Sequence, residues 1–305
     1  MRIDVHAHYY DAGLLSAMAR LGSDFSETAL RAPGAAVDLS QRMRLLDDAA
    51  IDIQVLSPGG LQPYLSDESS AVSAAELINN FHHAVVAEHP GRLAAFGCVP
   101  LPHVDAAIAT VGRCLDELGF LGINLGCSVG DRPLDEPEFE PVWAELDRRA
   151  AVVFLHPLGV VRPMMDEFGL AWAIGGRFED TVAAVRLVSS GATYRHHNVK
   201  IIVPHLGGTI PFLWDRFRDR PNADGEIFNV AEGLRRLYYD SINLAPGMLS
   251  SACQIIGAER VMLGTDFPWS SADLTTYTRA VEESGLTPAA ARDILDRNAS
   301  RVLGL

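Results

Sequence analysis

Short apolar segments alternate along the chain with longer amphipathic ones, and this alternation restricts the possible folds more than any other feature of the sequence. Eight such segments have the length and composition of strands. Several are apolar almost throughout, which is typical of strands that a parallel sheet buries on both faces. They are residues 2–7, 51–57, 93–100, 120–126, 151–156, 199–205, 237–242 and 260–266.

The segments between these strands have the periodicity of amphipathic helices. Eight strands joined by helical crossovers predict an α/β fold, the closed (β/α)8 TIM barrel. A doubly wound open sheet is the competing architecture, but it needs a reversal of strand order and usually has fewer strands. We expect helices at 41–50, 72–89, 104–118, 138–149, 179–190, 210–218, 248–256 and 273–297, the last broken near Gly285 and Pro288.

The length of 305 residues suits one barrel or two smaller domains. No linker rich in Pro, Gly or Ser and no block of charge marks a boundary, so we predict a single domain over 1–305. The segments 9–40 and 157–178 are longer than ordinary connections. Segments of this kind are often insertion loops over the C-terminal face of a barrel, or subunit contacts.

Polar residues stand at the ends of several strands, where TIM barrels place their active sites. The first strand ends in His6 and His8, and the period-2 alternation of a strand turns both side chains toward the barrel axis. The fifth, sixth and eighth strands end in His156, His205 and Asp266. Any one of these histidines alone would more often be structural. Their convergence predicts a metal site made of His6, His8, His156 and Asp266.

Imidazoles with one carboxylate suit zinc, manganese, iron or cobalt better than calcium. We expect one divalent metal, zinc first and manganese as the alternative. The four cysteines, Cys98, Cys114, Cys127 and Cys253, form no CxxC pair, so a zinc ribbon or a redox pair has no support.

The formal net charge of −14 argues against nucleic acid or an anionic membrane as a partner, because a binder of polyanions carries a basic face. The chain shows no secretory signal at its first residues and no apolar run of about 18 residues. We therefore expect a cytoplasmic protein that binds a small molecule.

Taken together, these motifs resemble the amidohydrolase superfamily, and within it the decarboxylase branch typified by 2-amino-3-carboxymuconate-6-semialdehyde decarboxylase. The resemblance covers essentially the whole chain. The matching segments are IDVHAH, MRLLDDAAIDIQVLS, LGFLGINLG, FLHP, VPHLGGTIPFLWDR and RVMLGTDFPW.

The resemblance implies a role for each of these residues. His6, His8, His156 and Asp266 match the ligands of the first, fifth and eighth strands. His205 matches a histidine that works beside the metal as general acid/base, and we expect His205 or Asp266 to handle the proton.

Four residues are candidates for binding the substrate. Arg216 matches an arginine that, in the branch, crosses a dimer interface to bind a substrate carboxylate, which implies a homodimer with Arg216 near the interface. Arg44 lies where relatives place another substrate-binding arginine, although surface ion pairs would explain it equally well. Trp172 and Trp269 could stack on a flat conjugated substrate, although packing is the commoner role of such residues.

Members with two metals bridge them with a carboxylated lysine at the end of the fourth strand, where this chain reads FLGINLGCS. The missing lysine implies a single metal. The leading hypothesis is therefore non-oxidative decarboxylation of an aromatic or muconate-like carboxylic acid. The alternative is a metal-dependent hydrolase or hydratase acting on a lactone or related small acid, because the same ligands can activate water. A barrel without catalytic activity would need the loss of a ligand, and the sequence shows none.

Overall fold

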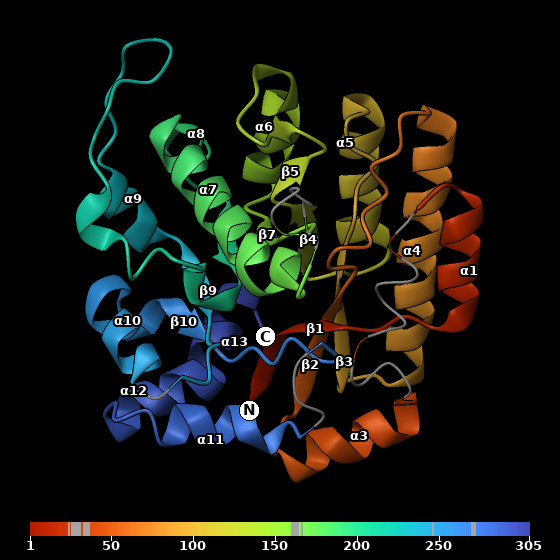
Figure 1. The fold of residues 1–305 in the computed structure, drawn as a ribbon. Coiled ribbons are helices and arrows are strands. Elements are labelled where there is room, and N and C mark those ends of the chain that lie inside the picture. The colour runs from red at the N-terminus through yellow and green to blue at the C-terminus, as the bar shows by residue number, and fades with distance from the viewer. Residues whose placement is uncertain are drawn as a thin grey trace.

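Eight parallel strands form one sheet in a computed structural model, and the helices are arranged around them (Figure 1). The structure describes residues 1–23, 25, 32, 37–159, 165, 167–245, 247–269 and 273–305. In sheet order the strands are β1 (Ile3–His8), β2 (Ile53–Ser57), β3 (Leu93–Gly97), β4 (Gly122–Gly126), β7 (Val152–His156), β8 (Lys200–Val203), β9 (Tyr238–Asp240) and β10 (Val261–Met262). A two-stranded ribbon of β5 (Ser128–Val129) and β6 (Arg132–Pro133) follows β4.

The first and last strands meet and nearly close the barrel. Val5 N donates to Leu263 O at 2.9 Å, and His8 N donates to Phe267 O at 2.6 Å. Ala7 and Phe267 form a parallel bridge beyond the end of β10. The predicted (β/α)8 barrel is therefore confirmed.

Most predicted helices overlap helices of the structure, with ends that differ by a few residues. The predicted break near Gly285 separates two observed helices. The α-helices are α1 (Ala12–Arg20), α3 (Leu39–Asp48), α4 (Glu68–Glu88), α5 (Val104–Gly112), α6 (Glu140–Arg148), α7 (Gly176–Ser189), α8 (Ala192–Arg195), α9 (Val230–Arg236), α10 (Met248–Ile256), α11 (Thr275–Glu282), α12 (Pro288–Arg292) and α13 (Asn298–Leu303).

The predicted helix at 210–218 is wrong. This segment forms turns and a short 3-10 helix, Trp214–Arg216, and the crossover helix after β8 is α9. Helix α9 begins where the side chain of Asn229 accepts a hydrogen bond from Glu232 N. The apolar pattern was misleading because Phe212 is 81% exposed rather than part of a buried helical face.

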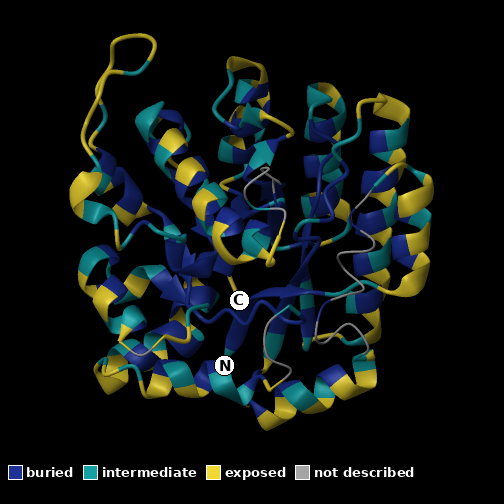
Figure 2. Cartoon of the chain, in the orientation of Figure 1, coloured by how far each residue is buried: buried dark blue, intermediate teal, exposed yellow. Residues whose placement is uncertain are grey.

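The strands are buried and the outward faces of the helices carry the exposed residues (Figure 2). Every residue of β1 is buried. A large apolar cluster lies between strands and helices, and a smaller one packs α13 against β1 through Val302 and Ile3. Sequence patterning did not identify α13 as a separate helix.

The two long segments lie partly outside the described residues. The first contains α1, which is capped by Asp11, whose carboxylate accepts from Leu14 N. The second leads through a π-helical turn, Ala171–Gly175, into α7. Their predicted place over the C-terminal face and the single-domain organisation remain predictions. In the part of the chain that the structure describes, no helix is long and apolar enough to cross a membrane.

Candidate metal centre

The four predicted ligands lie together at the C-terminal end of the barrel. His6 and His8 end β1, His156 ends β7, and Asp266 follows β10. One ligand atom from each residue lies within 4.8 Å of the other three, and all four residues are buried. The alternation of β1 thus turns both histidines inward as predicted.

The nitrogens that face the centre fit a bound cation. His6 Nε2 and His156 Nε2 are buried and have no hydrogen-bond partner. Asp266 Oδ1 lies 3.2 Å from His6 Nε2 and 3.3 Å from His8 Nε2. Burying polar nitrogens without a partner costs free energy, which a metal bond would offset. Three imidazoles and one carboxylate form a ligand set suited to zinc or manganese.

Oxygen atoms hold the other nitrogen of each imidazole. His6 Nδ1 lies 2.5 Å from Asp240 Oδ2, and His8 Nδ1 lies 3.1 Å from the carbonyl oxygen of Ser57. His156 Nδ1 lies 2.8 Å from the carbonyl oxygen of the next residue. These acceptors favour a proton on Nδ1, which leaves the lone pair of Nε2 directed at the centre.

His205 lies beside the four ligands and is held by a buried carboxylate. Its Nδ1 is 2.8 Å from Asp180 Oδ2 on α7, and its Nε2 is 3.5 Å from Asp266 Oδ2. The thiol of Cys127 donates to the other carboxylate oxygen of Asp180 at 3.5 Å. Asp180 therefore fixes the orientation of the imidazole and directs Nε2 toward the metal site.

The carboxylates dominate the electrostatics of the site. Burial alone would raise the pKa of Asp266, but the charge of His6 and hydrogen bonding with His205 and His8 hold it well below its usual range. Burial alone would lower the pKa of His6, but Asp266 and Asp240 raise it to about 10. Without a metal, a proton on His6 thus balances the negative charge of Asp266 and Asp240. A bound cation would replace that proton.

The same balance applies to His205. Burial is the largest single effect and lowers its pKa, but the charge of Asp180 together with hydrogen bonds to Asp180 and Asp266 raises the pKa above the usual value. His205 is thus favoured in its protonated form, whereas Asp266 is ionised.

Three residues around the site have left-handed backbone without being glycine. The φ angles are 54° at His205, 56° at Leu206 and 55° at Asp266. This conformation is uncommon for residues with a side chain, and such residues tend to cluster at functional sites.

The predicted aromatic residues form a cluster of their own. The rings of Trp172 and Trp269 stack on each other, 6.1 Å apart and inclined by 15°, and Phe25 contacts both edgewise. Tyr10 connects this cluster to His8, with ring centroids 6.2 Å apart. A flat substrate could contact an outer face of the cluster but would not lie between the two stacked indoles.

The predicted arginines are exposed. Arg44 lies on the exposed face of α3, and Arg216 ends the 3-10 helix after β8. Their role in substrate binding remains a prediction. Arg177, at the start of α7, was not predicted, and it lies close enough to His205 to affect the pKa of that residue.

Sequence reasoning missed two carboxylates that support the site. Asp240 ends an apolar strand, so the rule that identified the ligands would also have identified it. Asp180 lies inside a helix, where nothing in the sequence separates it from surface carboxylates.

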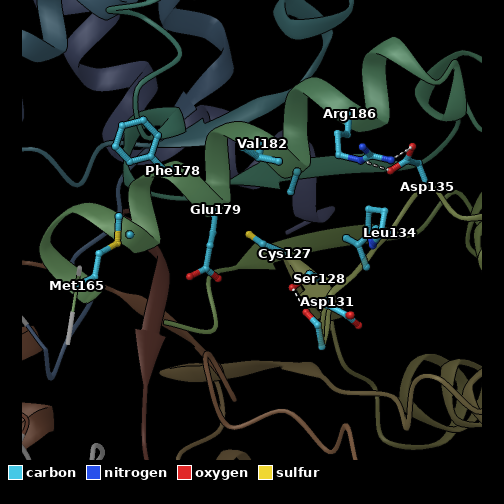
Figure 3. A pocket seen from close by; sticks show the side chains of 14 residues that line it. Cys127, Ser128, Asp131, Leu134, Asp135, Met165, Phe178, Glu179, Val182 and Arg186 are labelled. Carbon is cyan, nitrogen blue, oxygen red and sulfur yellow. Dashed lines mark hydrogen bonds and ion pairs between the residues drawn. The ribbon is translucent and has the colours of Figure 1, made fainter. Parts of the chain in front are cut away.

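A cavity of about 500 Å³ lies beside α7 (Figure 3). Cys127, Glu179 and Val182 are among its lining residues, and Arg186 donates to Asp135 at its edge. None of the four predicted metal ligands lines this cavity. The cavity is therefore separate from the metal centre.

Comparison with known proteins agrees with this geometry. The family model described as amidohydrolase matches residues 3–305. The chain is 29% identical over 276 residues to 2-amino-3-carboxymuconate-6-semialdehyde decarboxylase of Dictyostelium discoideum, covering 88% of this chain and 77% of that protein. It is 27% identical over 239 residues to 2-keto-4-carboxy-3-hexenedioate hydratase of Sphingobium sp., covering 73% and 69%.

The fold resembles that of a dihydroxybenzoic acid decarboxylase from Polaromonas sp. JS666, solved with bound manganese and the inhibitor 2-nitroresorcinol. The TM-score is 0.83 at 23% identity, covering 100% of this chain and 97% of the other. The expected family resemblance is therefore confirmed. Since the family model spans nearly every residue, from the first strand to the last helix, this protein belongs to the amidohydrolase family.

Proposed function

We propose that this protein is a metal-dependent carboxy-lyase that releases CO2 from an aromatic or muconate-like carboxylic acid without oxidation. One observation carries the proposal: His205, held by Asp180, presents Nε2 3.5 Å from the carboxylate of the predicted metal ligand Asp266. This arrangement brings a proton-carrying group to a site that can bind a cation. The decarboxylase relative from Dictyostelium discoideum adds support.

His6, His8, His156 and Asp266 would hold one divalent metal. When bound, the metal would supply Lewis-acid polarisation and a fixed point for orienting substrate oxygens. Zinc is our first proposal because it suits histidine and carboxylate ligands. Manganese is the alternative, and its presence in the Polaromonas relative supports it.

In this reaction the carbon–carbon bond to the carboxylate breaks, and its electron pair remains on the substrate carbon. That carbon must receive a proton. Asp266 is ionised, whereas the pKa of His205 is raised, so we propose His205 as the proton donor and Asp266 mainly as a ligand. Asp180 keeps the imidazole in place while the proton moves.

The substrate carboxylate would bind to arginine. We propose a homodimer in which Arg216 reaches the site of the neighbouring subunit. Phe212, close to Arg216 in the sequence, is 81% exposed, and covering it would favour association. Arg44 and the Trp172–Trp269 cluster remain candidates for further substrate contacts. We also propose a cytoplasmic location.

Metal analysis and a screen for CO2 release test the proposal. The purified protein is expected to contain about one zinc or manganese per chain. The variants His8→Ala and Asp266→Ala are expected to lose this metal, and the parent protein is expected to release CO2 from one of a panel of aromatic and dienoic acids. Absence of bound metal in the parent protein after incubation with either ion would contradict the proposed site.

Hydration or lactone hydrolysis is the second candidate, and the hydratase relative from Sphingobium sp. favours it. The two reactions differ in the fate of solvent oxygen. A hydratase or hydrolase incorporates ¹⁸O from labelled water into its product, whereas decarboxylation does not need to. Product ¹⁸O without CO2 would replace the decarboxylase proposal by this one.

A further inference from the structure

We propose that Asp4, Gln54 and Arg42 form a buried hydrogen-bonded relay that positions the metal ligands and thereby sets the affinity for the metal. The inference rests on the proposed metal site and concerns residues that do not belong to the ligand set. Asp4 lies on β1, Gln54 on β2 and Arg42 on α3, and each is at most 1% exposed.

Asp4 forms one end of the relay and ties three chain segments together. Its Oδ1 accepts from the backbone N–H groups of His6 and Thr265, both at 3.1 Å. Its Oδ2 accepts from Gln54 Nε2 at 2.7 Å and from the hydroxyl of Thr265 at 2.8 Å. The carboxylate thus holds the peptide of one metal ligand, His6, and the peptide next to another, Asp266.

Arg42 forms the other end. Its Nη2 donates to the carbonyl oxygen of His8 at 2.6 Å, and its Nη1 donates to Gln54 Oε1 at 2.7 Å. The guanidinium lies over the rings of Tyr9 and Phe267, at 5.2 and 4.6 Å from their centroids. This end therefore holds the main chain of a third ligand, His8.

The relay has a fixed polarity because Gln54 has one donor group and one acceptor group. Its NH2 faces the carboxylate of Asp4, and its oxygen faces the guanidinium of Arg42. If the amide were rotated by about 180°, its oxygen would face the carboxylate oxygen of Asp4, and its NH2 group would face the N–H groups of Arg42. The two buried charges also balance each other across the amide, and removing one would leave the other without a counter-charge in a region that excludes water.

The relay compensates for an irregularity in β1. The pairing of β1 with β2 shifts register between Asp4 and Ala7, so a regular ladder does not fix the peptide of His6. The Asp4 carboxylate binds the main chain inside that shift, at His6, and the Arg42 guanidinium binds it just beyond the shift, at His8. Ligand atoms must be held within about 0.5 Å for strong metal binding, so these three side chains act on the metal through the ligands they position.

Isosteric exchanges test the relay. Asp4→Asn removes the charge and places an NH2 group against the donors. Gln54→Glu places a second carboxylate against Asp4. Each single change is expected to weaken Mn²⁺ or Zn²⁺ binding by roughly 10- to 100-fold, measured by competition with a chelator on protein shown to be folded by circular dichroism.

The double variant Asp4→Asn/Gln54→Glu is the decisive case. The introduced asparagine would donate to the introduced glutamate, the glutamate would pair directly with Arg42, and the negative charge would only have moved from β1 to β2. All groups of the relay are again paired, so the double variant is expected to recover most of the affinity lost in the single variants. The visible absorption of bound Co²⁺, which reports ligand geometry, is expected to recover in parallel.

Asn79→Asp is a matched control, because Asn79 is fully buried and its amide pairs with the backbone of Cys98 rather than with metal ligands. It is expected to lower thermal stability and leave metal affinity unchanged. Single variants with the parent affinity, or a double variant as weak as the weaker single variant, would overturn the relay. A parent protein that binds no metal would instead overturn the proposed function.

Discussion

Replacing Asp180 by asparagine tests how His205 is held for proton transfer. The bond between His205 Nδ1 and Asp180 Oδ2 is 2.8 Å long and buried. Asparagine can keep the geometry by turning its oxygen toward His205 and its NH2 group toward the sulfur of Cys127. The substitution therefore removes the negative charge and little else.

The size of the effect follows from that charge. A hydrogen bond to an ionised group contributes about 1.5–3 kcal/mol, compared with about 1 kcal/mol between neutral groups. Because asparagine keeps a neutral hydrogen bond to His205, the loss in the transition state is the difference between the two, about 0.5–2 kcal/mol, and kcat falls by about 2- to 30-fold, since about 1.4 kcal/mol corresponds to a factor of ten. The metal ligands are untouched, so metal content is expected to stay at the parent level.

The assay is CO2 release from the acid that the screen identifies, with kcat, KM, metal content and Tm measured on the same preparation. Cys127→Ala is the control, because it removes only the weak thiol donor to Asp180; it is expected to change kcat by less than about twofold. The reasoning would be refuted if Asp180→Asn kept its metal and at least half of the parent kcat. It would also be refuted if the variant lost metal, because Asp180 would then support the ligands.

Three further predictions concern the surroundings of the site. Gly59→Ala is expected to weaken metal binding by at least tenfold in a chelator titration, because the new Cβ would lie 2.6 Å from the ring of His8. Gly130→Ala, with a similar positive φ but open space around it, is the control and should bind metal like the parent. His82 is buried, burial lowers its pKa to about 4, and its neutral ring pairs with Tyr9 O. The unfolded chain then binds the extra proton between pH 6.5 and 4, so the free energy of unfolding should fall by about 3 kcal/mol over that range. Denaturant titrations in chelator should show a flatter pH dependence for His82→Gln, and equal slopes would contradict the argument. Finally, removing metal held at about 100 times its Kd should lower the unfolding free energy by about 3 kcal/mol, seen as a lower Tm, and an unchanged Tm would argue against a site formed only in the folded state.

The barrel and the convergence of the four candidate ligands could be predicted because both depend on local pattern. The apolar runs reveal strands buried on two faces, and parallel strands end at the same face, so His6, His8, His156 and Asp266 had to converge. The absence of a helix at 210–218 could not be predicted from local pattern, because the sequence does not show that Phe212 faces solvent. Exposure of an apolar residue depends on the path of the whole chain.

The supporting residues were harder to predict for a different reason. Asp4 and Gln54 lie in strands, where the sequence does not distinguish them from other polar residues. Arg42 lies in a helix that carries several other charged residues. Their roles come from contacts across segments 12 to 261 residues apart. Pairings of that kind follow from the closed barrel and cannot be read from any single segment.

The meeting of β1 and β10 also has a consequence for biosynthesis. His6 and His8 leave the ribosome early, whereas Asp266 and the segment that pairs with β1 are made about 260 residues later. Until then the nascent chain carries two exposed histidines without their carboxylate, and their capture of metal ions from the surrounding solution would be weak and unselective. The complete site arises only when the barrel seam closes, which is a slow, non-local step. Metal loading is thus expected to follow translation, and the composition of the metal pool around the finished chain decides which ion it receives.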